Sequence, residues 1–367
     1  MATGWPQCSA IGALLVAVIT ACSSGNRPAR GPARTAVYYS PEALPTLNAG
    51  SGNANAINGV GDIVGAISGS SGEMTACVWS KGRLRMLQVP VGFAGSNAMA
   101  VSNGGVIVGD AFAVDSKGTS QMRAVAWHGT AARLLPTPEL FRVCGADGVS
   151  GSGVVVGGGS RNLVSTGFPL EWRNGRVQVL PTPANDGGEA DGVSDSGVVV
   201  GGVISDIPAR GMYTRPAEWV GGRLKLLPMP AGFIRGKAKG VNRVGDVTGW
   251  ISKGKDVFES RPCLWIRAAV HVLSLPVGAT GGQAHGINGR GEIVGSFWDT
   301  KHSLRAFVWS ARSGPYDLNR VAGGGQPDHP VYESANAIDN AGDIVADGAA
   351  VINRRAILGG YILHPKL

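Results

Sequence analysis

Short apolar runs separated by glycine and other turn-forming residues recur along most of the chain. Segments such as Asp62–Ser68 and Thr75–Trp79 are rich in β-branched or aromatic residues and are bounded by Gly, Asn and Ser. This pattern is typical of short strands joined by hairpin turns. No apolar period of 3.6 residues extends over the length of a helix, so the pattern predicts an all-β protein.

The runs belong to an internal repeat, which decides the architecture before any single strand is assigned. Seven segments share the order Ala, any residue, Ala or Gly, Ile or Val, then Asn, Ser or Asp, two further residues, Gly, any residue, and Ile or Val. Their glycines lie 44 to 51 residues apart and are Gly61, Gly105, Gly153, Gly197, Gly245, Gly291 and Gly342.

Two more series of residues follow the same period. An aromatic residue stands between successive glycines, at Trp79, Trp127, Trp172, Trp219, Trp265, Trp309 and Tyr361. A leucine of a Leu-Pro or Leu-x-x-Pro segment follows it, at Leu87, Leu135, Leu180, Leu227 and Leu273, with a weaker counterpart at Leu318. Each repeat has room for four strands, which predicts a seven-bladed β-propeller of four-stranded antiparallel blades over residues 40–367. The repeat aromatic and leucine positions are expected to form the core.

The ends of the repeat region predict how the ring is closed. The seventh repeat lacks an outer Leu-Pro strand, whereas Glu42–Leu47 has the sequence of an outer strand without a blade of its own. We therefore expect the N-terminal strand to complete the last blade, which leaves only short strand edges. Tyr38 or Tyr39 could instead occupy the position of the repeat tryptophan. Which N-terminal strand closes the ring is therefore left undecided by one strand.

The first 21 residues have the pattern of an export signal. They contain no Lys, Arg, Asp or Glu, and Ala10–Ala21 is one apolar run, too short for a bilayer that needs about 20 residues. Ile19–Cys22 resembles the bacterial lipobox, in which the cysteine is lipidated. The sequence therefore predicts a lipoprotein signal peptide over 1–21, then the lipidated Cys22 and a flexible Gly/Pro/Arg-rich tether over 22–39.

This segment also predicts where in the cell the protein is located. Attached acyl chains would hold the protein outside the cytoplasm, on the bacterial cell membrane or the outer membrane. Export permits disulfides, but Cys77 and Cys263 occupy equivalent positions in repeats that are not neighbours. We expect them and Cys144 to be small buried apolar residues instead.

Several repeat segments resemble a known family. The strand Arg-Ala-x-x-Trp occurs as Arg123–Trp127 and Arg305–Trp309, together with the Leu-Pro segment and an Ile-Asn-x-x-Gly-x-Ile-Val-Gly element. These resemble the bacterial extracellular HAF-repeat family, of which this chain is a divergent member because Arg or Pro replaces the His of the His-Ala-Phe triplet. The resemblance implies an exported protein of repeated β units and carries no agreed activity.

Common catalytic and cofactor signatures are missing from the sequence. It has no Gly-x-Ser-x-Gly, no His-Glu-x-x-His and no phosphate loop ending in Gly-Lys-Ser or Gly-Lys-Thr. The six histidines occupy non-equivalent positions. We predict no catalytic residue, cofactor or metal site, and we interpret the acids after the repeat glycines, Asp62, Asp246, Glu292 and Asp343, as turn residues rather than calcium ligands.

One register of the repeat changes while its neighbours stay constant. The residue after the repeat Ala is in turn Asn55, Met99, Asp147, Asp191, Lys239, His285 and Asn336. The first strand of a blade normally lies nearest the central axis, so these side chains are candidates to line one mouth of the channel and bind a ligand. The alternative is that solvent tolerates any residue there. Off the repeat, Trp250 and Trp298 are candidates to stack on a sugar or a partner, with packing as the alternative.

Composition narrows the choice of function without deciding it. The chain has 58 Gly in 367 residues, 44% hydrophobic and 16% charged residues, and a net charge of +8, which argues against a coiled coil or a charged disordered chain. A basic exported protein favours anionic envelope polymers or lipid head groups. Dense Lys/Arg runs are absent, and an exported protein is outside the compartment that holds nucleic acid, so no nucleic-acid partner is expected.

Two functions from different classes remain. The favoured one is a membrane-tethered, monomeric, non-enzymatic scaffold that binds a protein, a glycan or a small ligand. The alternative is an extracytoplasmic lyase or hydrolase with a metal-dependent site at the channel mouth, because propeller folds also host enzymes.

Overall fold

A computed structural model gives the structure of the protein, and its chain divides into two units, residues 1–34 and 35–367. The structure describes residues 37–47, 50–68, 72–114, 120–161, 167–183, 186–207, 211–254, 256–267, 269–323, 329–352 and 355–366. The predicted signal peptide 1–21, the candidate lipidation site Cys22 and the tether up to residue 36 lie outside the described residues. No helix in the described part is long and apolar enough to cross a membrane.

The described chain is almost entirely β-structure, which confirms the predicted all-β class and the four-stranded antiparallel sheets. The first sheets in chain order contain β2 (Gly52–Ile57), β3 (Ile63–Ser68), β4 (Met74–Ser80) and β5 (Arg83–Met86), then β6 (Gly95–Val101), β7 (Val106–Val114), β8 (Ser120–His128) and β9 (Ala131–Leu134). Next come β10 (Val143–Val149), β11 (Val155–Ser160), β12 (Phe168–Arg173) and β13 (Arg176–Val179).

The second half repeats this order. It contains β14 (Gly188–Val193), β15 (Val199–Ile207), β16 (Gly211–Val220) and β17 (Arg223–Leu226), then β18 (Arg235–Val241), β19 (Val247–Ser252), β20 (Arg261–Ile266) and β21 (Ala269–Val272). The last strands are β22 (Ala279–Ile287), β23 (Ile293–Asp299), β24 (Leu304–Ser310) and β25 (Gly314–Asp317), then β26 (Val331–Ile338), β27 (Ile344–Ile352) and β28 (Arg355–Pro365), which pair with β1 (Tyr39–Ala43).

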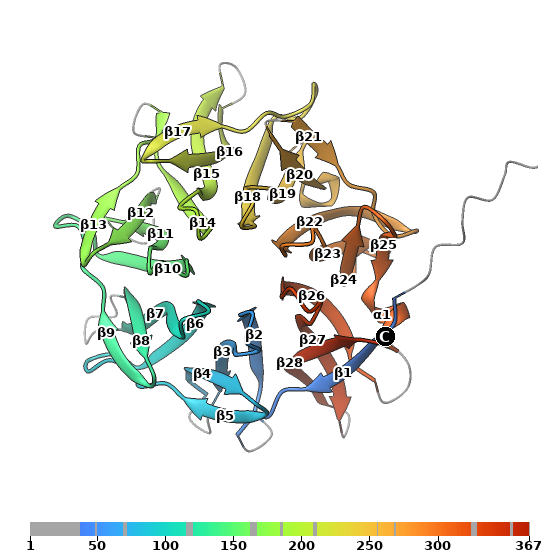
Figure 1. Cartoon of the computed structure of the whole chain (residues 1–367), viewed down its shortest axis with the longest axis horizontal. Helices are drawn as coiled ribbons and strands as arrows, with labels where there is room; N and C mark the ends of the chain where they lie inside the picture. Colours follow the sequence, from blue (N-terminus) through green and yellow to red (C-terminus); the bar gives the residue numbers. More distant parts are fainter. Residues whose placement is uncertain are drawn as a thin grey trace, which may run out of the picture. The chain divides into compact units, whose positions relative to one another are not determined.

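The sheets of this unit are arranged around a common centre (Figure 1). The first strand of each set of four, such as β2 or β14, faces the centre, and the fourth, such as β5 or β17, lies at the periphery. The β6–β9 and β10–β13 sets form one eight-stranded sheet through a single parallel pairing of Met122 with Val143. Two short helices interrupt the strands, η2 (Val257–Glu259) and α1 (Leu318–Val321).

The repeat glycines have the turn conformation that the sequence predicted. Their φ angles lie between +74° and +96°, a region that side chains other than Gly rarely adopt. Three residues before each glycine stands a buried polar side chain; Asn58 Oδ1 accepts from the Asp62 N–H at 2.9 Å, and Asn58 Nδ2 donates to the Ser102 carbonyl of the next sheet at 3.0 Å. The Asn, Ser or Asp of the repeat therefore closes its own turn, and at Asn58 it also links two sheets.

The core lies between neighbouring sheets, where the repeat aromatic residues pack. Trp127 is fully buried with Val64, Val78 and Leu87 of the preceding sheet. Its indole N–H donates to the Gln88 carbonyl at 2.8 Å, next to the repeat leucine of that sheet. Trp79, Trp172, Trp219 and Trp265 make the same bond to a proline carbonyl, which explains why the aromatic and Leu-Pro series share one period. The predicted core role is confirmed for these five tryptophans, whereas Trp309 and Leu135 are only partly buried against core clusters.

The N-terminal segment pairs with the last sheet. β1 runs antiparallel to β28, with Tyr39 opposite Pro365. Leu44 packs with Trp79 of the first sheet and Ile362 of the last. The strand lies at Tyr39–Ala43, earlier than the predicted Glu42–Leu47. The reason is that the outer strand of each sheet ends just before the repeat leucine. Leu44 and Pro45 are the Leu-Pro segment of this sheet.

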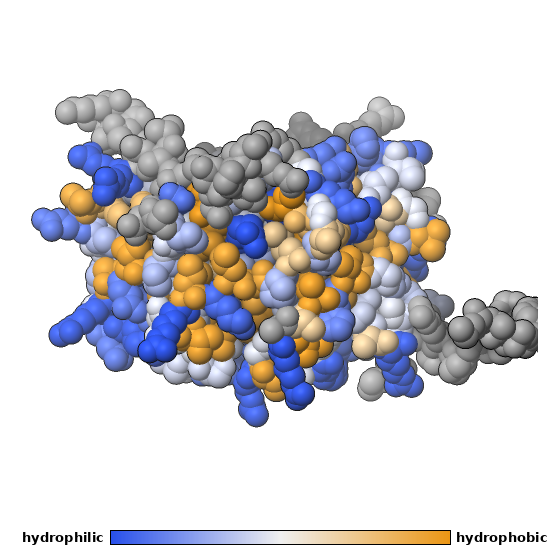
Figure 2. Space-filling model, turned by 90° about the horizontal axis from the view of Figure 1, so that it is seen from above, coloured by the Kyte–Doolittle hydropathy of each residue, from blue (hydrophilic) through white to orange (hydrophobic). Residues whose placement is uncertain are grey.

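Cys77, Cys144 and Cys263 are buried with free thiols, as predicted. Apolar and hydrophilic residues are interspersed over the face that Figure 2 shows, and long hydrophilic side chains project from it.

Candidate functional site

The structure brings all seven residues of the variable register to one cavity of about 550 Å³, here called the axial cavity. It lies where the first strands meet around the centre, and its polar lining comprises Asn55, Asp147, Asp191, Lys239, His285, Asn336 and Asp347, with Met99 beside them. Sequence reasoning missed Asp347, because it belongs to the second strand of its sheet. The cavity volume is within the range of about 300 to 1,000 Å³ typical of small-ligand sites.

A β-bulge places each of these residues. In the pairing of β2 with β3, Ala54 and Ala56 are matched to Gly65 and Val64, and Asn55 between them has no partner. The same register shift occurs at the equivalent position of the other sheets. A bulge leaves one residue unpaired and redirects its side chain. The variable register is therefore the set of bulged residues, which the strands hold toward the axial cavity.

The charged side of the axial cavity is a network around Asp191. Its Oδ1 lies 2.6 Å from Lys239 Nζ and 3.0 Å from Lys237 Nζ. The Asp191 side chain is 8% exposed, and its Oδ2 is buried without a hydrogen-bond partner among the described residues. A buried carboxylate oxygen is costly to leave unbonded, so the two ammonium groups at Oδ1 must stabilise the charge of Asp191.

The amide side of the cavity is bonded to the protein itself. Asn336 Nδ2 donates to the Ala54 carbonyl and to Asp347 Oδ2, both at 2.8 Å. Asn55 Nδ2 donates to the Ala98 carbonyl at 2.8 Å. These two bulged side chains therefore join neighbouring sheets. Their amide oxygens are engaged as well: Asn55 Oδ1 accepts from Asn53 Nδ2 at 3.2 Å, and Asn336 Oδ1 accepts from Ser334 Oγ at 2.7 Å.

His285 is held as a neutral imidazole. Its Nδ1 lies 3.2 Å from the Ala335 carbonyl and its Nε2 lies 3.4 Å from Ser296 Oγ. Burial lowers the pKa of His285 to about 4, and the nearby Lys239 charge acts in the same direction. In the described ranges, no three His, Cys, Asp or Glu side chains are placed to hold a metal ion.

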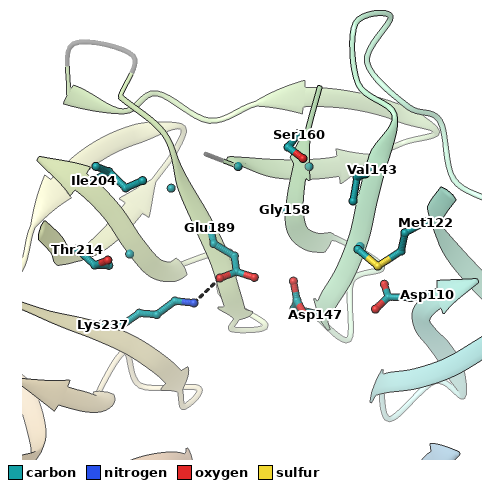
Figure 3. Close-up of a pocket in the computed structure, with 15 residues that line it drawn as sticks. Asp110, Met122, Val143, Asp147, Gly158, Ser160, Glu189, Ile204, Thr214 and Lys237 are labelled. Carbon is teal, nitrogen blue, oxygen red and sulfur yellow. Dashed lines mark hydrogen bonds and ion pairs between the residues drawn. The ribbon is translucent and has the colours of Figure 1, made fainter. Parts of the chain in front are cut away.

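A second cavity, the side cavity, lies beside Asp147 and has a volume of about 450 Å³ (Figure 3). Its charged residues are Asp110, Asp147, Glu189 and Lys237, and Figure 3 shows Asp147 between Glu189 and Asp110. Lys237 Nζ donates to Glu189 Oε2. The apolar part of the wall comes from Met122, Val143 and Ile204.

The carboxyl groups of the side cavity differ in their electrostatics. Burial raises the pKa of Asp110 to about 7, with a further contribution from Glu189, against the hydrogen bond from the Ala146 N–H. Burial also raises the pKa of Asp147 well above its usual range, and the charges of Glu189, Asp110 and Asp191 add to this. Burial opposes ionisation of Glu189 too, but the ammonium of Lys237 lowers the pKa of Glu189.

Sequence reasoning did not single out Asp110, Glu189 or Lys237. A signal was present: Gly158 and Gly202 stand where other repeats carry Ala66, Asp110, Trp250, Ser296 and Asp347. The sequence alone does not show that these glycines leave a cavity. That depends on how the first and second strands pair, which sets Gly158 opposite Gly145.

The remaining candidates lie apart from both cavities. Three of the turn acids bond within their own turns, as when Asn288 Nδ2 donates to Glu292 Oε2 at 2.7 Å. The fourth, Asp343, has its Oδ1 2.9 Å from His364 Nδ1 of β28. Trp250 and Trp298 are both partly buried; Trp250 lies under the Arg235 guanidinium at 5.2 Å, and Trp298 meets Phe258 edge-on at 5.6 Å. Protein contacts therefore already cover part of both rings.

Comparison with solved structures identifies the fold. The acylaminoacyl peptidase of Pyrococcus horikoshii aligns with a TM-score of 0.54 and 13% identity, over 84% of this chain and 50% of that chain. The β-propeller domain of the Trilobed protease from Pyrococcus furiosus, described as having an open velcro topology, aligns with a TM-score of 0.54 and 11% identity, over 85% of this chain and 93% of that chain. The chain is thus similar to β-propellers and spans about half the length of the peptidase.

Comparisons of sequence add no relative. No family model matches the chain, and no curated protein matches it. The resemblance to the HAF-repeat family stays a prediction.

Proposed function

We propose that the protein is an exported, lipid-anchored β-propeller that binds a small polar ligand or the end of a glycan in the axial cavity without transforming it. One observation carries the proposal: the bulged register differs from repeat to repeat, and its seven residues surround one cavity. A scaffold that keeps its repeat framework and varies the residues around its central cavity is suited to recognition.

Seven blades closed into a ring form part of the proposal. Support comes from the core that Leu44, Trp79 and Ile362 share across the first and last sheets. The repeat segments support membership of the HAF-repeat family, and the Ile19–Cys22 segment supports anchoring through Cys22, with residues 22–39 as a tether on the cell membrane or outer membrane. We expect a monomer and no nucleic-acid partner.

Binding suits the axial cavity better than catalysis because its strongest groups are already engaged. Asp191 is paired with two lysines, and His285 is neutral with partners at both ring nitrogens. What the cavity offers a ligand is a mixture of the amides of Asn55 and Asn336, the ammonium of Lys239 and the carboxyl group of Asp147. Such a mixture fits a polyhydroxylated or zwitterionic ligand.

The binding function is tested with the full chain on a glycan array, followed by calorimetry with any glycan retained. Replacing Asp191 and Lys239 together by Asn and Met should reduce affinity at least about tenfold, the equivalent of about 1.4 kcal/mol. The control is Glu218→Gln, which alters a surface ion pair with Lys225 away from both cavities. Equal retention by the double variant would exclude the axial cavity as the binding site.

The metal-dependent lyase or hydrolase is the competing proposal, and a thermal-shift screen separates it from the scaffold. Divalent metal ions are added to the full chain with and without a chelator. A rise in melting temperature that the chelator abolishes would favour the enzyme, and an unchanged melting temperature would favour the scaffold. Anchoring is tested separately: Cys22→Ser should move the protein from the membrane fraction to the soluble fraction.

A further inference from the structure

Glycines form much of the wall of the side cavity. Two of them, Gly158 and Gly202, lie where four other repeats carry a polar or large side chain and one carries Ala66. The atoms nearest to a Cβ atom on Gly158 would be Glu189 Cγ at 3.3 Å, Glu189 Oε1 at 3.9 Å and the Phe168 carbonyl oxygen at 3.9 Å. Gly158 therefore leaves space beside Glu189 that a side chain would occupy, and this space is part of the cavity. Gly202 is different, because a Cβ atom there would lie 2.5 Å from Thr214 Cγ2.

Its wall combines charge with apolar surface in the way that small-ligand sites do. Asp110 and Asp147 have no ion-pair partner among the described residues, whereas the one ammonium in the wall, on Lys237, is already engaged by Glu189 and Asp191. Met122, Val143 and Ile204 supply an apolar wall. The cavity therefore attracts a positive group and can also pack against a short carbon chain.

A second observation comes from the adjoining network. Asp191, whose Oδ1 binds Lys237, has a buried Oδ2 without a hydrogen-bond partner. The acceptors of this region thus outnumber its donors even after both lysines are counted. The raised pKa values of Asp110 and Asp147 have the same origin, since burial and mutual repulsion disfavour their ionised forms until a cation compensates them.

We propose that the side cavity is a binding site for a small organic cation, a primary amine or a guanidinium on a short carbon chain, held by the carboxylates of Asp110 and Asp147. A bare metal ion fits less well, because no three carboxylates or histidines of the described chain converge on one point. An anion would meet three carboxyl groups and a lysine that is already paired. The site goes beyond the proposed axial site, although Asp147 lines both cavities.

The test is calorimetry on the full chain with agmatine, cadaverine and benzylamine. Their neutral analogues 1,5-pentanediol and benzyl alcohol, and calcium chloride, serve as comparison ligands. We expect at least one of the cations to bind with a Kd below about 1 mM, which corresponds to about 4 kcal/mol, and each neutral analogue to bind at least about tenfold more weakly. Absence of binding by all three cations, or binding of calcium with equal affinity, would overturn the proposal.

Variants locate the site. Asp147→Asn and Asp110→Asn keep the side-chain shape, and each should weaken the amine at least about tenfold, since a hydrogen bond to a charged group contributes about 1.5–3 kcal/mol. Gly158→Leu should abolish binding by filling the cavity, and Gly158→Ser, which copies the residue found at Ser296, is the milder alternative if the leucine variant does not fold. Glu218→Gln should bind the amine as the wild type does. Unchanged affinity in the two aspartate variants would place the amine elsewhere and overturn the assignment.

Failure here is distinguishable from failure of the axial proposal. Asn336→Ala changes a residue that lines the axial cavity and not the side cavity, so it should leave amine affinity unchanged. If amine binding is absent while a glycan still binds and responds to the Asp191 and Lys239 double variant, only the side-cavity proposal is wrong.

Discussion

Asp347 Oδ1 accepts a hydrogen bond of 2.9 Å from the backbone N–H of Ala54, and so links the last sheet to the first. Asp110 and Ala146, at the equivalent positions of two consecutive sheets, make the same bond at 3.1 Å. The repeat therefore uses one device both between neighbouring sheets and between the two ends of the described chain. In the last sheet the other oxygen, Asp347 Oδ2, also accepts from Asn336 Nδ2.

Removing the acceptor at Asp347 should weaken this link. Asp347→Ala leaves the buried N–H of Ala54 and the amide of Asn336 without their partner, so we expect a loss of about 1–3 kcal/mol in the free energy of unfolding. Urea denaturation followed by tryptophan fluorescence measures it. Asp347→Asn retains an acceptor oxygen for the Ala54 N–H and should lose less; equal losses in both variants would show that this hydrogen bond contributes little.

Asp110 should make stability depend on pH. Its folded pKa of about 7 lies above the value near 4 of an unfolded chain, so between these two values the folded state binds more protons than the unfolded state. The free energy of unfolding therefore falls as pH rises through this window. Asp110→Asn removes the effect while keeping an acceptor for the Ala146 N–H.

We expect Asp110→Asn to be more stable than the wild type at pH 8 by about 1 kcal/mol or more, since one pKa unit corresponds to about 1.4 kcal/mol. The difference should shrink toward pH 4, where the wild-type carboxyl is protonated as well. Urea titrations at pH 4, 6 and 8 give this comparison. A difference that is constant across the three pH values would contradict a raised pKa.

The three cysteines of the sheets should be unreactive in the folded protein. Burial raises the pKa of Cys144 to about 11 and raises the pKa of the Cys77 and Cys263 thiols further, so almost no thiolate is present at pH 8. Iodoacetamide should label all three in guanidinium chloride and none under native conditions, as read by peptide mass spectrometry. Native labelling at Cys263 would indicate local opening of β20 against β21.

The outer strands carry exposed cations that should keep their free edges apart. Arg83 and Arg85 project from β5, the peripheral strand of the first sheet. Charged side chains on edge strands hinder edge-to-edge pairing. Replacing both by Thr should increase aggregation in static light scattering without lowering the urea midpoint. The control removes two positive charges from exposed positions outside the strands, at Arg142 and Arg243, and should not aggregate; equal aggregation would indicate an effect of net charge.

Much of this fold could be predicted because each repeat restates the same rule. The glycines with positive φ, the tryptophans with their leucines, and the strand runs between them all follow one period, so independent signals agree. The position of β1 was predicted less well. The Leu-Pro segment suggested an outer strand over Glu42–Leu47, but the strand is Tyr39–Ala43 and ends before Leu44. The rule that the leucine follows the outer strand becomes visible only when β5 is seen to end at Met86, before Leu87.

The candidate sites also differ in how far the sequence could predict them. The variable register could be found from sequence because it is one position in each repeat. Asp347 and the side cavity could not, because they depend on which residues of adjacent strands face each other: Glu189 opposite Gly202, and Ser334 opposite Asp347. A bulge changes that register by one residue, and sequence spacing alone does not reveal its exact position.

The pairing of β1 with β28 has a consequence for the order of folding. Tyr39 is synthesised more than three hundred residues before Pro365, its partner in the last sheet. Contacts so distant along the chain form late and slowly. Until β28 is available, β1 has no partner strand, and Leu44 cannot complete the core beside Trp79. The intermediate sheets can assemble in sequence on their neighbours, but the first and last must wait for each other, so a nascent chain interrupted before β28 should carry an unpaired strand at its leading end and be a substrate for chaperones.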